Sequence, residues 1–272
     1  MDFFIISVLV LVITGIVIGF ASGLLGVGGG FLMVPVQFWL LTSMGVDPTV
    51  AIRVAFGTSL AVVIPTALSS AWGHHCRKCV LVRPLTLMIL PCIAGAFIGG
   101  TLATHLPGRL MEMLFGILVL LAAVRMLVAI PSKSGDRIRE SIPLYLAWGF
   151  LFGGVSGLLG IGGGIIMVPV MVTLMGFSMH EALGTSTALM LFSSISGAVS
   201  YIVNGIGTVG LPPWSLGYVN LVQWLPLVAV SIPMAQVGVR AAHRLPADKI
   251  RYIFVIVMAV IGLHMVQSGF FG

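Results

Sequence analysis

This chain contains very little charge. Of its 272 residues only 7% are Asp, Glu, Lys or Arg, whereas 59% are hydrophobic. A water-soluble protein of this size needs polar residues to cover its surface, so the composition excludes a soluble domain. Apolar blocks of about 18–22 residues, a length that spans a bilayer as a helix, alternate with short charged clusters. The alternating short strands of a transmembrane barrel are missing from the sequence. We therefore predict a polytopic, all-α helical membrane protein.

Acidic residues are the scarcest charged residues. Seven Asp and Glu stand against 13 Lys and Arg, which gives a net charge of +6. The basic residues lie between the apolar blocks, where the positive-inside rule places them, so the charge does not indicate a nucleic-acid partner. All seven carboxylates are expected in loops or near helix ends, and no buried carboxylate relay for protons is predicted. The phosphate-binding pattern G-x-x-x-x-G-K-[ST] is absent, so the chain has no ATPase motif of its own.

Cysteine is also rare. Cys76 and Cys79 lie in the segment His74–Cys79 (HHCRKC), and Cys92 is expected to be a small buried apolar residue. A C-x-x-C pair can bind zinc or form a disulfide, and neighbouring basic residues would lower the thiol pKa. Four ligands within six residues do not easily form one tetrahedral site, so Cys76 and Cys79 are weak metal candidates and no cofactor is predicted. They do support an alternative function, that of a membrane-bound thiol redox or sulfur-transfer protein.

Glycine, by contrast, is abundant and patterned. The fifteen residues Ser22–Val36 (SGLLGVGGGFLMVPV) return as Ser156–Val170 (SGLLGIGGGIIMVPV), with twelve positions identical. Gly57-Thr58-Ser59 matches Gly184-Thr185-Ser186 in the same way. We therefore predict two homologous membrane repeats, 1–130 and 142–272, joined by a polar linker at 131–141. Their predicted segments are about 3–24, 31–43, 50–73, 84–104 and 109–130, then 143–160, 165–177, 182–203, 221–240 and 250–270.

Loop charges indicate how the two repeats are oriented. The predicted loop His74–Arg83 holds three basic residues, whereas its counterpart Asn204–Asn220 holds none. Conversely, His105–Arg109 is lightly charged, whereas its counterpart Arg240–Arg251 holds four basic residues. Equivalent loops thus have opposite charge character. This predicts that the repeats are inverted in the membrane and that the linker is cytoplasmic.

Three consecutive glycines occur in each repeat, at Gly28, Gly29 and Gly30 and again at Gly162, Gly163 and Gly164. The apolar segments that follow are too short to span a bilayer comfortably, so we expect broken or half-helices and eight to ten membrane segments. A helix that begins after such a loop presents free N–H groups and the positive end of its dipole, which is the chemistry of anion binding. Two such termini can converge near the midplane of inverted repeats. The alternative is that the glycines only permit close helix packing.

Hydroxyl side chains recur beside these glycines at matching positions. Hydroxyls can donate to an oxyanion without a buried countercharge, although they can also bond to carbonyls of their own helix. Arg53 and His180 open the third segment of each repeat, where they could attract anions to a vestibule or anchor the helix at the interface. The candidate substrate-binding residues are Ser22, Gly28, Gly29, Gly30, Thr58 and Ser59, and Ser156, Gly162, Gly163, Gly164, Thr185 and Ser186.

The duplicated G-x-G-G-G-x-x-x-V-P pattern, followed by Gly-Thr-Ser in each half, resembles the TauE/SafE family of membrane transporters, also called sulfite exporters. The resemblance covers essentially the whole chain. It implies a secondary transporter, not an enzyme, that moves sulfite, sulfoacetate or another organosulfonate across the inner membrane, with the candidate residues forming its pathway or site. A small anion and the lipid bilayer are the expected partners, and a homo-oligomer is possible. Export of an anion from a cell that is negative inside gains about 2.3 kcal/mol per charge per 100 mV, so no coupling ion is required.

Overall fold

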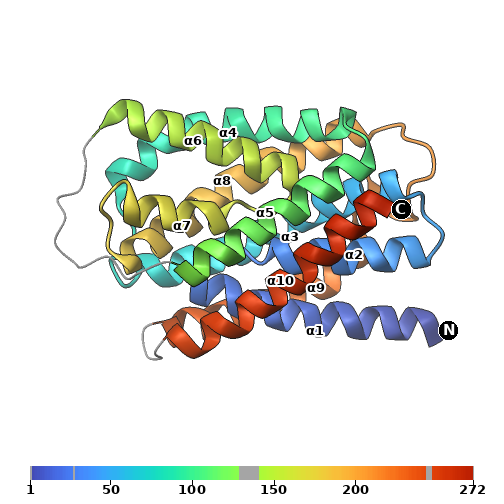
Figure 1. Ribbon diagram of the computed structural model, residues 1–272, viewed down its shortest axis with the longest axis horizontal. Helices are drawn as coiled ribbons and strands as arrows, with labels where there is room; N and C mark the ends of the chain where they lie inside the picture. The colour runs from blue at the N-terminus through green and yellow to red at the C-terminus, as the bar shows by residue number, and fades with distance from the viewer. Residues whose placement is uncertain (1, 27, 129–140, 243–246, 272) are drawn as a thin grey trace.

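The computed structural model describes residues 2–26, 28–128, 141–242 and 247–271 (Figure 1). Within these ranges the chain forms ten α-helices and one short hairpin, which confirms the all-α prediction. Apart from Ser141, the predicted linker lies outside the described residues. The helices are α1 (Asp2–Leu25), α2 (Gly30–Ser43), α3 (Pro48–His75), α4 (Val82–His105), α5 (Gly108–Val128), α6 (Ile142–Leu159), α7 (Gly164–Thr173), α8 (Met179–Gly205), α9 (Leu221–Ala242) and α10 (Ala247–Phe271), and the strands are β1 (Ser215–Leu216) and β2 (Val219–Asn220).

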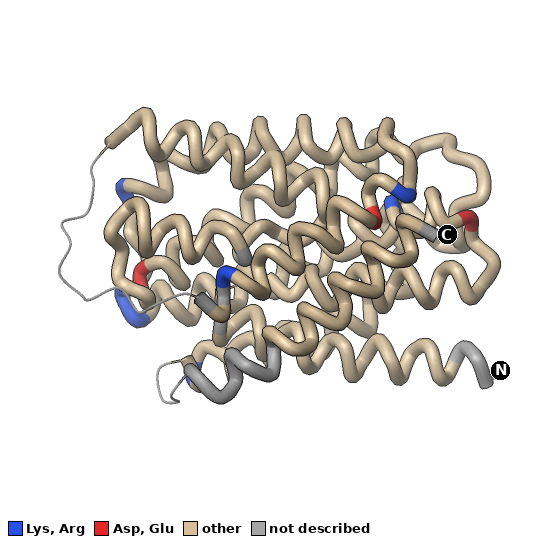
Figure 2. The backbone as a smooth tube through the Cα atoms, viewed as in Figure 1, with Lys and Arg blue, Asp and Glu red and all other residues tan. Residues whose placement is uncertain are grey.

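Six of these helices, α1, α3, α4, α6, α8 and α9, are long and apolar enough to cross a membrane. The helices that follow the glycine runs are shorter, with 14 residues in α2 and 10 in α7. At a rise of about 1.5 Å per residue they are roughly 21 and 15 Å long, well short of the hydrocarbon core of about 30 Å. They therefore have the length of half-helices. Figure 2 shows that charged residues lie toward the two ends of the bundle, with long uncharged stretches between them.

Local sequence signals define where the two central helices begin. Pro48 stands at the start of α3, and the Asp47 carboxylate accepts hydrogen bonds from the N–H groups of Thr49 and Val50. At the start of α8, Ser178 and Glu181 form a capping box in which each side chain bonds to the backbone of the other. Both arrangements satisfy N–H groups that the first turn of a helix leaves unpaired. As a result, α3 and α8 each begin two or three residues before the predicted segments.

The helices pair across the middle of the sequence. α1 packs along α9, α4 along α6, α3 along α8 and α5 along α10, so each pair joins a helix before residue 130 to one after residue 140. Glycines permit the closest approaches: Gly19 and Gly23 of α1 lie against the α9 backbone, and Gly153 and Gly157 of α6 lie against the α4 backbone. Such contacts are typical of helices that associate in a membrane through small residues. The two halves therefore share one core.

Candidate functional site

The two glycine-rich loops have the same backbone conformation. Three glycines in each loop adopt a positive φ, which residues with a Cβ atom rarely do. Gly29 and Gly163 serve as the left-handed N-caps of α2 and α7. The first two glycines of each run are therefore required by the backbone geometry, beyond any role in helix packing. The φ angles are 65°, 80° and 74° at Gly26, Gly28 and Gly29, and 65°, 77° and 80° at Gly160, Gly162 and Gly163.

Each loop leads directly into a helix N-terminus. The first N–H groups that donate to the Gly29 carbonyl are those of Leu32 and Met33, at 3.2 and 3.3 Å, and the corresponding bonds to the Gly163 carbonyl are 3.2 and 3.4 Å long. The N–H groups of Gly30 and Gly164, at the first helical positions, therefore lie outside the hydrogen-bond ladders of α2 and α7. Both helices contain no acidic residue in the first turn, so nothing there offsets the positive end of the dipole.

The structure brings the two glycine loops into direct contact. A Cβ atom on Gly30 would lie 2.6 Å from the Ile161 Cα atom, and one on Gly28 would lie 3.3 Å from the Ile161 carbonyl oxygen. Gly30 therefore approaches the backbone of the second loop more closely than any other residue type could. All the glycines of both runs are buried. The N-terminus of α2 thus meets the loop that leads into α7, inside the protein.

The serines of the two Gly-Thr-Ser motifs bond across to the opposite loop. The Ser59 hydroxyl donates to the Gly160 carbonyl, and the Ser186 hydroxyl lies 3.5 Å from the Gly26 carbonyl in the equivalent bond. Both hydroxyls also lie 3.1 Å from a carbonyl of their own helix, which is the alternative role considered from the sequence. These serines therefore position the loops that precede the glycine runs.

The threonines of the same motifs hold the entry loops of two other helices. The Thr58 hydroxyl accepts a hydrogen bond of 2.9 Å from the N–H group of Asn220, just before α9. The Thr185 hydroxyl accepts one of 3.0 Å from the N–H group of Leu81, just before α4. Gly57 and Gly184 lie directly under the same entry loops, against the backbone of Tyr218 and Cys79 respectively. The two motifs thus make equivalent contacts with loops at opposite ends of the bundle (Figure 1).

Ser22 and Ser156 occupy matching positions before the two loops, and both are fully buried. The Ser156 hydroxyl donates to the Ser193 hydroxyl at 3.1 Å. A Cβ atom on Gly163 would lie 3.1 Å from the Ser156 Cβ atom, so this serine lines the second loop. The Ser22 hydroxyl has no hydrogen-bond partner within the part of the chain that the structure describes.

Two buried polar residues near the core were missed by the sequence analysis. Ser194 of α8 is fully buried, its hydroxyl has no partner among the described residues, and it lies 3.6 Å from the position of a Cβ atom on Gly162. Gln37 of α2 is also fully buried, and neither atom of its amide group has a partner within the described ranges. The available signal was a polar residue inside an apolar helix. The sequence analysis considered polar residues at matching positions of the two repeats, and neither Ser194 nor Gln37 has such a match.

The candidate vestibule cation Arg53 is engaged with its neighbours. Its guanidinium donates to the Tyr218 hydroxyl at 3.3 Å and to the Leu106 carbonyl at 3.0 Å, and it lies 5.9 Å from the centroid of the Tyr218 ring. Arg53 therefore ties the loop before α9 to the turn between α4 and α5. His180, at the start of α8, is largely exposed.

Glu112 is a carboxylate near a helix end that is nevertheless buried. It lies in the second turn of α5, near a helix end as predicted, but only 3% of its surface is exposed. The Ser268 hydroxyl of α10 donates to its carboxylate at 2.8 Å. Its burial was not anticipated from the sequence, because it depends on α10, which packs along α5 and supplies a hydrogen-bond donor.

The two thiols of the cysteine segment differ in exposure, and the half-buried one is not activated. Cys76 is exposed, whereas Cys79 is half-buried beside Gly184. Burial raises the pKa of the Cys79 thiol and outweighs the charge of Arg77, which lowers it, so the expected activation by basic neighbours does not dominate. Among the described residues, no group of three or more His, Cys, Asp or Glu side chains is placed to hold a metal ion.

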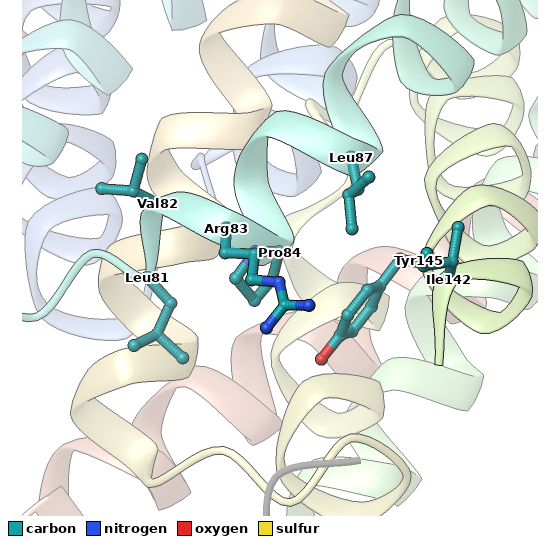
Figure 3. Close-up of a pocket in the computed structure, with 7 residues that line it drawn as sticks. All are labelled: Leu81, Val82, Arg83, Pro84, Leu87, Ile142 and Tyr145. Atoms are coloured by element: carbon teal, nitrogen blue, oxygen red, sulfur yellow. The ribbon is translucent and has the colours of Figure 1, made fainter. Parts of the chain in front are cut away.

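Two cavities differ in their relation to the glycine loops. One of about 280 Å³ lies between the first turns of α4 and α6, where the Arg83 guanidinium and the Tyr145 ring point toward each other from opposite walls (Figure 3). It shares no lining residue with either glycine loop. A second cavity, of about 40 Å³, is apolar and reaches Gly163 between Phe152 and Met167. The glycine loops are thus tightly packed in this conformation.

Comparison with known proteins places this chain in a family. Residues 11–265 match the family described as "Sulfite exporter TauE/SafE". The chain belongs to this family. It is 30% identical to a "Probable membrane transporter protein" of Haemophilus influenzae, over 95% of this chain and 97% of that protein. It is 27% identical to the "Probable membrane transporter protein YunE" of Bacillus subtilis, over 97% and 99% of the two chains.

A third relative, the "Probable membrane transporter protein MJ0441" of Methanocaldococcus jannaschii, is 26% identical over 96% of both chains. No solved structure matches this chain significantly. The protein is therefore a multi-pass membrane transporter of the TauE/SafE family, and the resemblance inferred from the glycine motifs is confirmed. The family is one of transporters and not of enzymes, as expected.

Proposed function

We propose that this transporter moves small sulfur-containing oxyanions, such as sulfite, sulfoacetate or another organosulfonate, out of the cell by alternating access around the two glycine loops. The observation that supports this most directly is the contact between Gly30 and Ile161, in which the N-terminus of α2 lies against the loop that leads into α7 in the interior. The family description adds the substrate class.

The chemistry of this junction suits an anion. Two helix N-termini supply N–H donors and the positive ends of two dipoles, and nearby hydroxyls supply further donors. No Lys or Arg is needed, so the anion would not be held by an opposite charge from which it could not easily leave. In a low-dielectric interior such fixed dipoles stabilise a charge more strongly than they would in water. Neutral donors of this kind are expected to bind an oxyanion firmly enough for it to enter the site and weakly enough for it to leave.

Alternating access requires a gate on each side of the site, and the two Gly-Thr-Ser motifs offer a matched pair. The loop ending at Asn220 rests on Gly57 and Thr58, and the loop ending at Leu81 rests on Gly184 and Thr185. We propose that these loops are the two gates of a pair of inverted repeats, 1–130 and 142–272. The end bearing the basic loop after α3 would face the cytoplasm, together with the linker 131–141.

We propose that the membrane potential drives export. Moving one negative charge out of a cell that is negative inside gains about 2.3 kcal/mol per 100 mV, enough for accumulation against a gradient without a coupling ion. Glu112 is the one buried carboxylate among the described residues and so the obvious competitor for proton coupling. Proton-dependent transport in vesicles clamped at zero potential, abolished by Glu112→Gln, would contradict this proposal.

Binding to the purified protein is the first test of the function. Thermal stabilisation or calorimetry would be measured with sulfite, sulfate, thiosulfate, sulfoacetate, taurine and acetate. Stabilisation by a sulfur oxyanion that is lost when Gly29 or Gly163 is replaced by Val supports the site. Gly45→Val is the control, because Gly45 has a positive φ but no neighbouring atom within 4 Å of its Cβ position. If no anion stabilises the protein but thiol reagents or zinc do, the alternative built on Cys76 and Cys79 replaces this proposal.

A further inference from the structure

The hydroxyl of Ser194 is buried without a hydrogen-bond partner among the described residues. A buried hydroxyl that makes no hydrogen bond lowers stability, because folding removes its bonds to water and returns nothing. Other buried serines of α8 are satisfied: Ser193 donates to the Met190 carbonyl at 3.1 Å, and Ser196 donates to the Ile93 carbonyl at 2.7 Å. The unpaired hydroxyl of Ser194 is explained if its hydrogen-bond acceptor is a bound molecule and not part of the chain.

Ser194 lies on a turn of α8 that contacts both glycine loops. Its Oγ atom is 3.6 Å from the position of a Cβ atom on Gly162, beside the N-terminus of α7. One helical turn earlier, the Met190 Sδ atom lies 3.0 Å from the corresponding position on Gly28 of the first loop. A single turn of α8 thus reaches both loops, and Ser194 is its only hydrogen-bond donor that has no partner within the described residues.

The first half has no equivalent hydroxyl. The spacing between the two Gly-Thr-Ser motifs matches Ser194 to Ala67 on α3, and Ser193 to Thr66. Thr66 is fully engaged, because its hydroxyl bonds to the Val62 carbonyl at 2.9 Å and lies 2.8 Å from the Ser231 hydroxyl. Two glycine loops with the same backbone are therefore surrounded by different donors.

We infer that Ser194 is a substrate-binding residue that donates its hydrogen to the anion held at the N-terminus of α7. This inference rests on the proposed transport of an oxyanion. The donors come from two directions, the N-terminal turn of α7 and the side of α8. A sulfur oxyanion such as sulfite or a sulfonate can accept from both.

The test combines anion binding with stability in the absence of anion. Ser194→Ala removes no hydrogen bond from the free protein, so its melting temperature should equal or exceed that of the wild type. Its dissociation constant for sulfite or sulfoacetate should rise roughly 10- to 100-fold, the effect of losing one hydrogen bond to a charged group. Ser194→Cys, which keeps a weaker donor, should fall between the two.

Two control variants separate this role from a structural one. Ser193→Ala removes a satisfied hydroxyl and should lower the melting temperature. Ala67→Ser places a hydroxyl at the matching position of α3 and should leave sulfite binding within about twofold of wild type, a change of under half a kcal/mol. If Ser194→Ala binds sulfite as the wild type does, the inference is wrong and the proposed function is unaffected. The same holds if Ser194→Ala loses as much stability as Ser193→Ala does. If the wild type binds no oxyanion, the proposed function fails first.

Discussion

Replacing Gly30 by alanine tests the contact between the two glycine loops. Gly30 is the first residue of α2 and its φ is not positive, so alanine meets no backbone penalty there. On intrinsic grounds the change should stabilise the helix by about 0.5–1 kcal/mol. The new methyl group, however, would lie 2.6 Å from the Cα atom and 2.7 Å from the carbonyl oxygen of Ile161. Ordinary contact between carbon atoms is about 3.5–4.0 Å, so the loops must separate by roughly 1 Å.

The expected net effect follows from these opposing terms. Overpacking against a backbone that cannot rotate away costs about 1–3 kcal/mol, which leaves Gly30→Ala destabilised by roughly 1–2 kcal/mol. Gly45→Ala is the control, because it should lose a similar amount of stability for a different reason. Gly45 has a φ of 82° and nothing within 4 Å of its Cβ position, so alanine there pays only the left-handed backbone cost of about 1 kcal/mol.

The assay measures unfolding and transport on the same two variants. Unfolding free energy in mixed detergent micelles should fall by similar amounts for both, whereas uptake of sulfite into inside-out vesicles should fall only for Gly30→Ala. If Gly30→Ala is as stable and as active as the wild type, the two loops do not touch in the membrane and the reasoning is wrong. If Gly45→Ala loses as much transport as Gly30→Ala, the loss reflects stability alone.

Three further predictions concern buried polar groups and the cysteine loop. Thr58→Val should destabilise the protein by about 1–3 kcal/mol, because it leaves the buried N–H group of Asn220 without an acceptor, and Thr58→Ser should restore most of the loss in the same unfolding assay. Near neutral pH a maleimide should label Cys76 well before Cys79, because burial raises the pKa of the Cys79 thiol and reduces the fraction present as thiolate. The difference between the two labelling rates, followed by mass spectrometry, should narrow in alkaline buffer. Equal rates at every pH would contradict the observed burial. Gln37→Met should raise the unfolding free energy by about 1–3 kcal/mol, since it removes a buried amide without partners among the described residues. A decrease in unfolding free energy would mean that the amide is hydrogen-bonded in the membrane.

Much of the fold could be predicted from the sequence, because in a membrane the backbone has few alternatives to the helix. The ten predicted segments correspond to the ten helices, with the largest differences at one end of α7, α8 and α10. The half-helix length of α2 and α7 followed from the glycines, which break the chain at Gly29 and Gly163 in both copies. The burial of Glu112 was not anticipated, because it depends on α10, a helix far away in sequence.

The candidate site was predicted less completely, because residue type does not reveal which partner a hydroxyl finds. Thr58 and Ser59 are adjacent in the sequence and were treated alike, yet one holds the loop before α9 and the other bonds to the second glycine loop. Residues at matching positions of the two repeats make equivalent contacts, as Thr58 and Thr185 do, whereas their role in a site stays a prediction. The same criterion hid Ser194, whose importance here comes from its lack of a polar counterpart.

The sequence by itself determined that this protein is a helical membrane transporter with two broken helices, because scarce charge and a duplicated glycine pattern permit little else. Only the tertiary structure decided that the two glycine loops touch each other and that their serines bond across the halves. It also decided that the hydroxyl of Ser194 has no partner within the described residues. The physical reason is that helix formation in a membrane depends on local hydrophobicity and backbone hydrogen bonding, whereas the satisfaction of a buried donor depends on atoms brought together from opposite ends of the chain.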